Sequence, residues 1–260
     1  MSSSPIRNGV RIAMWSGPRN ISTAMMRSWG ARPDCAVIDE PLYAHYLNSL
    51  SAAKRAEHPG WGDVIRSQPT SWVQVSRHLT GHVPGGKPIW YQKHMAHHLT
   101  AESSWDWSLN LTNCFLVREP AAMITSFIKV IENPTPDDLG LPQQVKLFEW
   151  VRANCDQAPP VLDSADVLRD PRGVLGTLCK RVRVPFSESM LSWAPGPRPE
   201  DGVWAPHWYA SVNRSTGFSA YTPKDEPVPD RLRGVLEECN GLYEILAAHR
   251  IQPSDAASGD

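Results

Sequence analysis

The order of short apolar runs along the chain constrains its fold most strongly. Five runs have the length of β-strands: Val10–Trp15, Cys35–Asp39, Pro88–Gln92, Asn113–Val117 and Pro160–Asp163. Stretches with helical periodicity fall between and after them, at Ser22–Trp29, Leu42–Ala56, Thr70–Leu79, Ala121–Ile131, Pro142–Ala153, Pro171–Val182 and Asp230–Ala248. This alternation is typical of a three-layer α/β fold, in which helices flank a central parallel β-sheet.

The 260 residues are 41% hydrophobic and contain no internal repeat, so we expect residues 1–260 to form one domain. We expect the first ~8 and the last ~10 residues to be flexible. The formal net charge of −1 argues against a nucleic-acid-binding protein, which needs clustered basic residues. No apolar run has the length of a membrane span, and the five scattered cysteines indicate reduced thiols. These features predict a cytoplasmic protein that does not associate with a membrane.

The stretch "RIAMWSGPRNISTAMMRSW", residues 11–29, reads as a strand, a turn and a helix. The first backbone N–H groups of a helix lack partners and carry partial positive charge, so a phosphate or sulfate can bind there. Arg19 adds a guanidinium, and Ser22 and Thr23 add hydroxyl donors. The missing G-K-[ST] argues against a nucleoside triphosphatase. An ordinary turn capped by Ser22 or Asn20 is the alternative.

The stretch "NCFLVREPAAMITSF", residues 113–127, is again a strand, a turn and a helix. Arg118 ends the strand, and Ser126 follows eight residues later, about two helical turns on. These two side chains could hold one phosphate between them. The alternative is an Arg118 paired with Glu119, beside a helical serine with no special role.

Together the two segments resemble the sulfotransferases that use 3′-phosphoadenosine-5′-phosphosulfate (PAPS), whose fold is similar to that of P-loop nucleoside triphosphatases. "PRNIST" takes the place of that family's 5′-phosphosulfate loop, P-K-x-G-[ST]-[ST], and "REPAAMITS" matches its 3′-phosphate motif, R-x-P with a later Ser. "VLDSADVLRDPRGVLGTLCKRVRVPF" and "VNRSTGF" also fall where the family has similar segments. The resemblance covers roughly residues 8 to 248, and is nearer to small bacterial-type members.

The resemblance implies PAPS as the donor substrate, 3′-phosphoadenosine 5′-phosphate (PAP) as the product, and no metal. It assigns the following residues to the donor: Arg19, Asn20, Ser22, Thr23, Arg118, Ser126, Arg214, Ser215, Thr216 and Gly217. Two departures stand out. Arg19 replaces the loop Lys and does not readily donate a proton, and Ile21 replaces the loop Gly.

Two segments offer a base for the acceptor proton. In "VIDEPLYAHYL", residues 37–47, Glu40 follows a strand, as does the base of trehalose-type sulfotransferases. A carboxylate there faces the crevice where α/β folds bind ligands. A helix-capping role for Asp39 or Glu40 is the alternative.

The second segment is "YQKHMAHHL", residues 91–99, which lies after a central strand, where the cytosolic relatives carry Lys-x-His. Lys93 could contact the sulfuryl group, and His94, His97 or His98 could act as the base. Their spacing also permits a zinc site, but no complete ligand set follows. We favour Glu40, with a histidine of 94–98 orienting the acceptor or replacing it.

The sequence therefore predicts a PAPS-dependent sulfotransferase that acts on a hydroxyl or amine of a small molecule. The acceptor pocket is expected to form from residues 40–107 and from the aromatic-rich segment 195–222, which lacks periodicity. Two alternatives are a P-loop-type small-molecule or nucleotide kinase and a non-catalytic nucleotide-binding relative.

Overall fold

A five-stranded parallel sheet forms the centre of the protein. The computed structural model describes residues 9–100, 103–223 and 226–252. The strands are β1 (Val10–Ser16), β2 (Cys35–Asp39), β3 (Ile89–Met95), β4 (Thr112–Val117) and β5 (Val161–Asp163), in the order β2-β3-β1-β4-β5. Ser16 pairs with Met95 on one side and with Leu116 on the other. The carboxyl ends of β1, β3 and β4 therefore lie side by side at one edge of the sheet.

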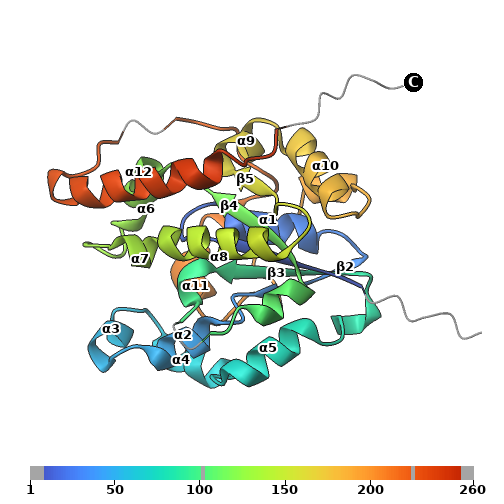
Figure 1. Cartoon of the computed structure of the whole chain (residues 1–260), viewed down its shortest axis with the longest axis horizontal. Coiled ribbons are helices and arrows are strands. Elements are labelled where there is room, and N and C mark those ends of the chain that lie inside the picture. The colour runs from blue at the N-terminus through green and yellow to red at the C-terminus, as the bar shows by residue number, and fades with distance from the viewer. Residues whose placement is uncertain (1–8, 101–102, 224–225, 253–260) are drawn as a thin grey trace, which may run out of the picture.

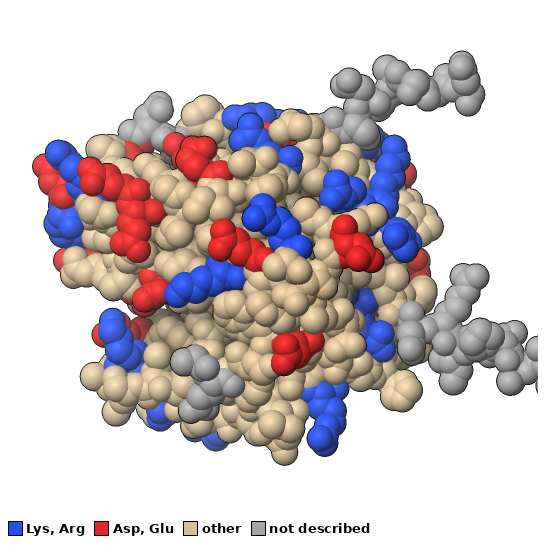
Figure 2. Space-filling model, viewed as in Figure 1, with Lys and Arg blue, Asp and Glu red and all other residues tan. Residues whose placement is uncertain are grey.

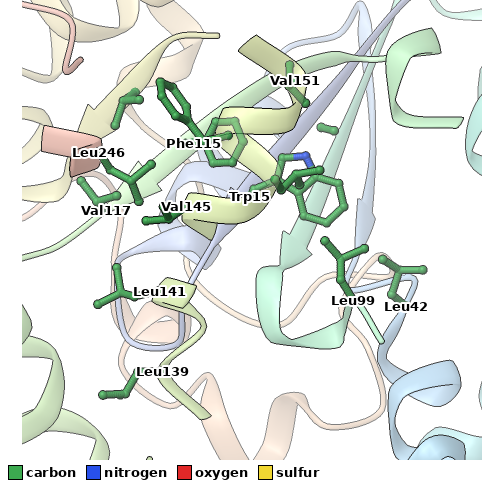
Figure 3. Close-up of a cluster of buried hydrophobic side chains, with 14 of the residues drawn as sticks. Trp15, Leu42, Leu99, Phe115, Val117, Leu139, Leu141, Val145, Val151 and Leu246 are labelled. Carbon is green, nitrogen blue, oxygen red and sulfur yellow. The ribbon is translucent and has the colours of Figure 1, made fainter. Parts of the chain in front are cut away.

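Strand residues alternate between two apolar layers, one on each face of the sheet. Ile12 and Met14 pack in a cluster with residues of α1 (Ser22–Gly30) and α10 (Pro171–Arg181). Trp15 and Phe115 belong to the opposite cluster, with residues of α5 (Trp72–Thr80), α8 (Leu141–Asn154) and α12 (Arg233–Ala247). Figure 3 shows Trp15 and Phe115 beside α8 residues of this second cluster. The predicted three-layer α/β fold is confirmed.

Shorter helices carry the chain around the edges of the sheet. They are α2 (Tyr43–Ser49), α3 (Ala52–Ala56), α4 (Trp61–Ser67), α6 (Pro120–Phe127), α7 (Pro136–Leu139), α9 (Ser164–Arg169) and α11 (Ala205–Trp208). The helices of residues 43–80 gather along one edge of the molecule, and α12 runs along the opposite edge (Figure 1). A third apolar cluster joins α2 and α4 to α11, so segment 195–222 packs against residues 43–67.

Several elements differ from the sequence expectation, and three examples follow. Strand β3 continues to Met95, so Lys93 and His94 lie within the strand and not after it. The expected helix Leu42–Ala56 is broken at Leu50, whose extended backbone ends α2 before Ser51 caps α3. Helix α4 was not predicted, because its seven residues are too few to show a clear period.

The surface charge, the cysteines and the helix lengths were also compared with the sequence expectations. Acidic and basic side chains are interspersed over the face seen in Figure 2. All five cysteines are free thiols. Within the described ranges, no helix is long and apolar enough to cross a membrane. The flexible ends predicted from the sequence lie largely outside the described residues.

Candidate active site

A cavity of about 620 Å³ opens at the carboxyl edge of the sheet. It gathers most of the residues that the sequence singled out, although they come from five separate segments. Those that line it are Arg19, Asn20, Ser22, Thr23, Glu40, Lys93, His97, His98, Arg118, Ser126, Arg214, Ser215 and Gly217. His94 and Thr216 do not line the cavity.

The turn between β1 and α1 has an unusual backbone. Arg19 and Ile21 have φ angles of 64° and 57°, in the left-handed region that non-glycine residues rarely adopt. Ile21 occupies the N-cap position, where its apolar side chain makes no capping hydrogen bond. The alternative of a turn capped by Ser22 or Asn20 is therefore wrong. The first-turn residues Ser22, Thr23 and Ala24 line the cavity, and an uncapped helix N-terminus there favours an anion.

Buried amides hold this turn in place from below. The Asn20 side chain donates to the carbonyl of Leu116 over 2.8 Å, which ties the turn to β4. Gln144 of α8 donates to the carbonyls of Trp15 and Leu116, over 3.0 and 3.2 Å. A side chain on Gly17 would meet the Leu139 carbonyl oxygen at 2.3 Å. The turn is thus packed tightly from both the sheet and the helices, and Asn20 acts as one of its supports.

The second predicted segment meets the first turn directly. Arg118 Nη1 donates to the carbonyl of Arg19 over 2.5 Å, and Arg19 Nε donates to Ser126 Oγ over 3.0 Å. Within the described part of the chain, neither guanidinium has a carboxylate in ion-pair distance, so the alternative Arg118–Glu119 pair does not form. Burial lowers the pKa of both arginines, and the charge of Arg19 lowers the pKa of Arg118 further. Two unpaired, half-buried cations beside a helix N-terminus suit a phosphate or sulfate.

An ionic cluster lines the same cavity as the arginines. Lys93 Nζ donates to Asp39 Oδ1 over 2.8 Å and also to Glu40 Oε1. The side chains of Asp39 and Lys93 are each 1% exposed, whereas that of Glu40 is 11% exposed. Glu40 has a positive φ of 39°, a third strained backbone at this cavity. Burial raises the pKa of Glu40, and the charge of Lys93 opposes that rise.

The histidines of 94–98 have different environments. Because β3 includes His94, its side chain points to the face opposite Lys93, where it stacks on Trp15 at 4.3 Å. Burial lowers the pKa of His94 to about 3. His98 lines the cavity between Tyr43 and Tyr46, with ring centroids 4.6 and 4.9 Å away, and burial lowers its pKa well below the usual value. The structure thus brings His97 and His98 to the site, and leaves His94 in the core.

The sulfotransferase domain family matches residues 10–249, nearly the whole of the chain. The chain belongs to the sulfotransferase domain family. Two plant relatives from Arabidopsis thaliana are similar to it: branched-chain-amino-acid aminotransferase-like protein 2, at 32% identity over 95% of this chain, and protein 1, at 34% over 92%. The chain spans less than half the length of these curated relatives, 43% and 42% respectively.

Two solved sulfotransferase domains have a similar shape. One is the domain from the curacin biosynthetic pathway, with a TM-score of 0.49 at 15% identity over 90% of this chain and 98% of that one. The other is the domain from the Synechococcus PCC 7002 olefin synthase, with a TM-score of 0.46 at 16% identity over 92% and 98%.

The late segment of this sulfotransferase domain closes the cavity. Arg27 of α1 makes two hydrogen bonds to the Asp201 carboxylate, over 2.5 and 2.7 Å, and so anchors the segment. Arg214, Ser215 and Gly217 then line the cavity. The Ser215 hydroxyl is engaged with the carbonyl of Val212 and with the indole N–H of Trp193.

Tyr209, which the sequence did not single out, is the further member of the ionic cluster in this sulfotransferase domain. The Tyr209 hydroxyl donates to Asp39 Oδ2 over 2.7 Å and accepts from Lys93 Nζ over 2.9 Å. The aromatic content of segment 195–222 indicated a functional loop, but it gave no reason to choose Tyr209. Across residues 9–100, 103–223 and 226–252, no three His, Cys, Asp or Glu side chains group as a metal site.

Proposed function

We propose that this sulfotransferase domain transfers a sulfuryl group from PAPS to a hydroxyl or amine of a small molecule. The contact between the two phosphate-type turns carries the proposal. Arg19, Ser126 and Arg118 meet beside the uncapped N-terminus of α1, and in the described residues no carboxylate lies within ion-pair distance of either arginine. A donor with two anionic ends would supply the missing negative charge.

The donor would lie along the arginine side of the cavity. Arg19, Ser22, Thr23 and the first N–H groups of α1 would hold its 5′-phosphosulfate. Its 3′-phosphate would be bound by Arg118 and Ser126, with Arg214 and the residues up to Gly217 closing over it. Asn20, which the resemblance also assigned to the donor, would support this loop because its amide is bonded to β4.

The acceptor would lie between the donor and the ionic cluster. Sulfuryl transfer forms a bond from the acceptor oxygen or nitrogen to sulfur, breaks the bond from sulfur to the phosphate oxygen, and releases the acceptor proton. Glu40 is the most exposed member of the cluster and would take that proton. Arg19 remains charged and would stabilise the departing phosphate oxygen electrostatically. His97 and His98 would orient the acceptor.

The experiment is a transfer assay with an unbiased acceptor pool. Purified protein is incubated with PAPS and a metabolite extract, and mass spectrometry follows compounds that gain one SO3 group while PAP accumulates. The proposal predicts at least one such compound, absent with boiled protein. PAP binding without any transfer would instead indicate a non-catalytic binding protein, and magnesium-dependent ATP turnover would indicate a kinase.

A further inference from the structure

Lys93 has all three of its ammonium hydrogens engaged. They are donated to Asp39, to Glu40 and to the hydroxyl of Tyr209. Lys93 is 1% exposed, so it cannot reach a ligand without breaking one of these bonds. This arrangement differs from a lysine that contacts the sulfuryl group, which was the sequence expectation. Lys93 instead places a positive charge against the carboxylate of Glu40.

Both carboxylate oxygens of Asp39 also have hydrogen-bond partners. One carboxylate oxygen accepts from Lys93, and the other accepts from the Tyr209 hydroxyl over 2.7 Å and from the Gly202 N–H over 3.1 Å. The Tyr209 hydroxyl also accepts from Trp204 Nε1 over 3.2 Å, so its position is fixed by three partners. Glu40 is the most exposed member of the cluster.

We infer that Tyr209 and Asp39 are positioning residues, which hold Lys93 beside Glu40, the proposed base. This inference rests on the proposed function for the role of Glu40. Tyr209 belongs to segment 195–222, whose next residues would close over the donor. The same segment thus completes both the donor side and the acceptor side of the cavity.

The two positioning residues act on Glu40 with opposite sign. The negative charge of Asp39 raises the pKa of Glu40, whereas the charge of Lys93 lowers it. The Tyr209 hydroxyl donates its one proton to Asp39 and accepts from Lys93, so it acts on Glu40 through these two groups. Tyr43 of α2 also faces Glu40, and its phenol stays neutral because burial raises its pKa. Asparagine keeps an oxygen that accepts from Lys93 and removes only the charge, so Asp39→Asn should move the Glu40 titration to lower pH. Tyr209→Phe removes the hydroxyl that binds Lys93 and Asp39, and should move the titration to higher pH. A purely structural role would not give opposite shifts.

The test is a carbon-13 NMR titration of glutamate side-chain carboxyls in the whole protein, with Glu40→Gln used to assign the Glu40 resonance. We expect midpoint shifts of roughly one pH unit, downward in Asp39→Asn and upward in Tyr209→Phe. Tyr243→Phe is the matched control, because it removes another tyrosine–aspartate bond, to Asp163. Its Glu40 midpoint should equal that of the wild type.

Midpoints that stay unchanged, or that move in the same direction in both variants, would overturn the inference. If Tyr209→Phe fails to fold, the direction of the Asp39→Asn shift decides alone. Calorimetry of PAP binding to the wild type tests the proposed donor separately from the inference on Asp39 and Tyr209. If PAP does not bind, the donor assignment is wrong, whereas the titration still reports whether Asp39 and Tyr209 control Glu40.

Discussion

Arg19 and Arg118 show at the residue scale why the cavity should bind an anion. Both side chains are partly buried, and the charge of Arg19 lowers the pKa of Arg118. Like charges held this close are unfavourable unless a ligand or counter-ion lies between them. In the ionic cluster, Lys93 pairs with two carboxylates, Asp39 and Glu40, so the cluster has one net negative charge when both are ionised. The cavity therefore has a cationic part for the donor and a carboxylate that can accept a proton.

Glu40→Gln tests the proposed base. The amide cannot accept the acceptor proton, so we expect kcat to fall about 10²- to 10⁴-fold. PAP affinity should stay within about twofold of the wild type, because Glu40 lies away from the arginines. Steady-state kinetics with the acceptor from the mass-gain screen, together with calorimetry, measure both quantities. Full turnover in Glu40→Gln would transfer the role of base to His97 or His98.

The pH dependence of the wild type follows from the same residue. Burial raises the pKa of Glu40 above its usual 4.5, and the base must be ionised to accept a proton. Activity should therefore be lost as pH falls, with a midpoint above 4.5, and this acid limb should be absent from the residual activity of Glu40→Gln. An acid limb that persists unchanged in Glu40→Gln would indicate a different titrating group.

At the scale of elements, the turn between β1 and α1 depends on close packing against the α7–α8 junction. Gly17→Ala would place a methyl group 2.3 Å from the Leu139 carbonyl oxygen, a backbone atom that cannot move freely. We expect a loss of about 1–3 kcal/mol in the free energy of unfolding, with weaker PAP binding because Arg19 shifts with the turn. Urea denaturation and calorimetry provide the two measurements.

Gly241→Ala is the matched control for this substitution. Gly241 lies in α12, and an added side chain there would meet nothing within 4 Å. Alanine is the better helix former, so the free energy of unfolding should rise by about 0.5–1 kcal/mol, with PAP binding unchanged. If both alanine variants have the same stability and affinity, the turn is not as tightly packed as the structure indicates.

Most of the architecture could be predicted from the sequence, because a buried parallel strand is a short apolar run. The end of β3 was mispredicted for a physical reason. Lys93 and His94 are polar residues inside a buried strand. Lys93 is tolerated there because it pairs with Asp39 and Glu40, and His94 because its ring stacks on Trp15. Neither partner could be identified from the local sequence of β3.

The candidate site was predictable where it depends on strand ends. Arg19 and Arg118 follow strands that are neighbours in the sheet, so their meeting follows from the topology. Tyr209 was not predictable, because it lies 116 residues from Lys93 in a segment without periodicity. Sequence spacing carries information about contacts within an element, and little about contacts made by an irregular loop.

At the scale of the whole molecule, buried histidines couple stability to pH. Burial lowers the pKa of His94 to about 3 and that of His98 well below 6.5. The unfolded chain binds protons on these imidazoles as pH falls below 6.5, whereas the folded protein does not. The contribution of these neutral histidines to the free energy of unfolding is therefore fully present above pH 6.5. Below pH 6.5 the free energy of unfolding falls by about 1.4 kcal/mol per pH unit for each histidine.

Urea denaturation at a series of pH values between 7.5 and 5 measures this loss. His94→Gln removes one of the coupled protons, so its unfolding free energy should fall less steeply with decreasing pH than that of the wild type. Equal slopes in the two proteins would show that His94 becomes protonated in the folded state as easily as in the unfolded chain.

Calorimetry with PAP tests the central claim most directly, because PAP carries the 3′-phosphate assigned to Arg118. The wild type is predicted to bind PAP, and Arg118→Ala to bind it about 10- to 100-fold more weakly, since a charged hydrogen-bonding partner is lost. Adenosine 5′-phosphosulfate lacks the 3′-phosphate, so the affinity of Arg118→Ala for this nucleotide should fall much less. The claim would be contradicted if the wild type does not bind PAP at millimolar concentration, or if Arg118→Ala weakens both nucleotides equally.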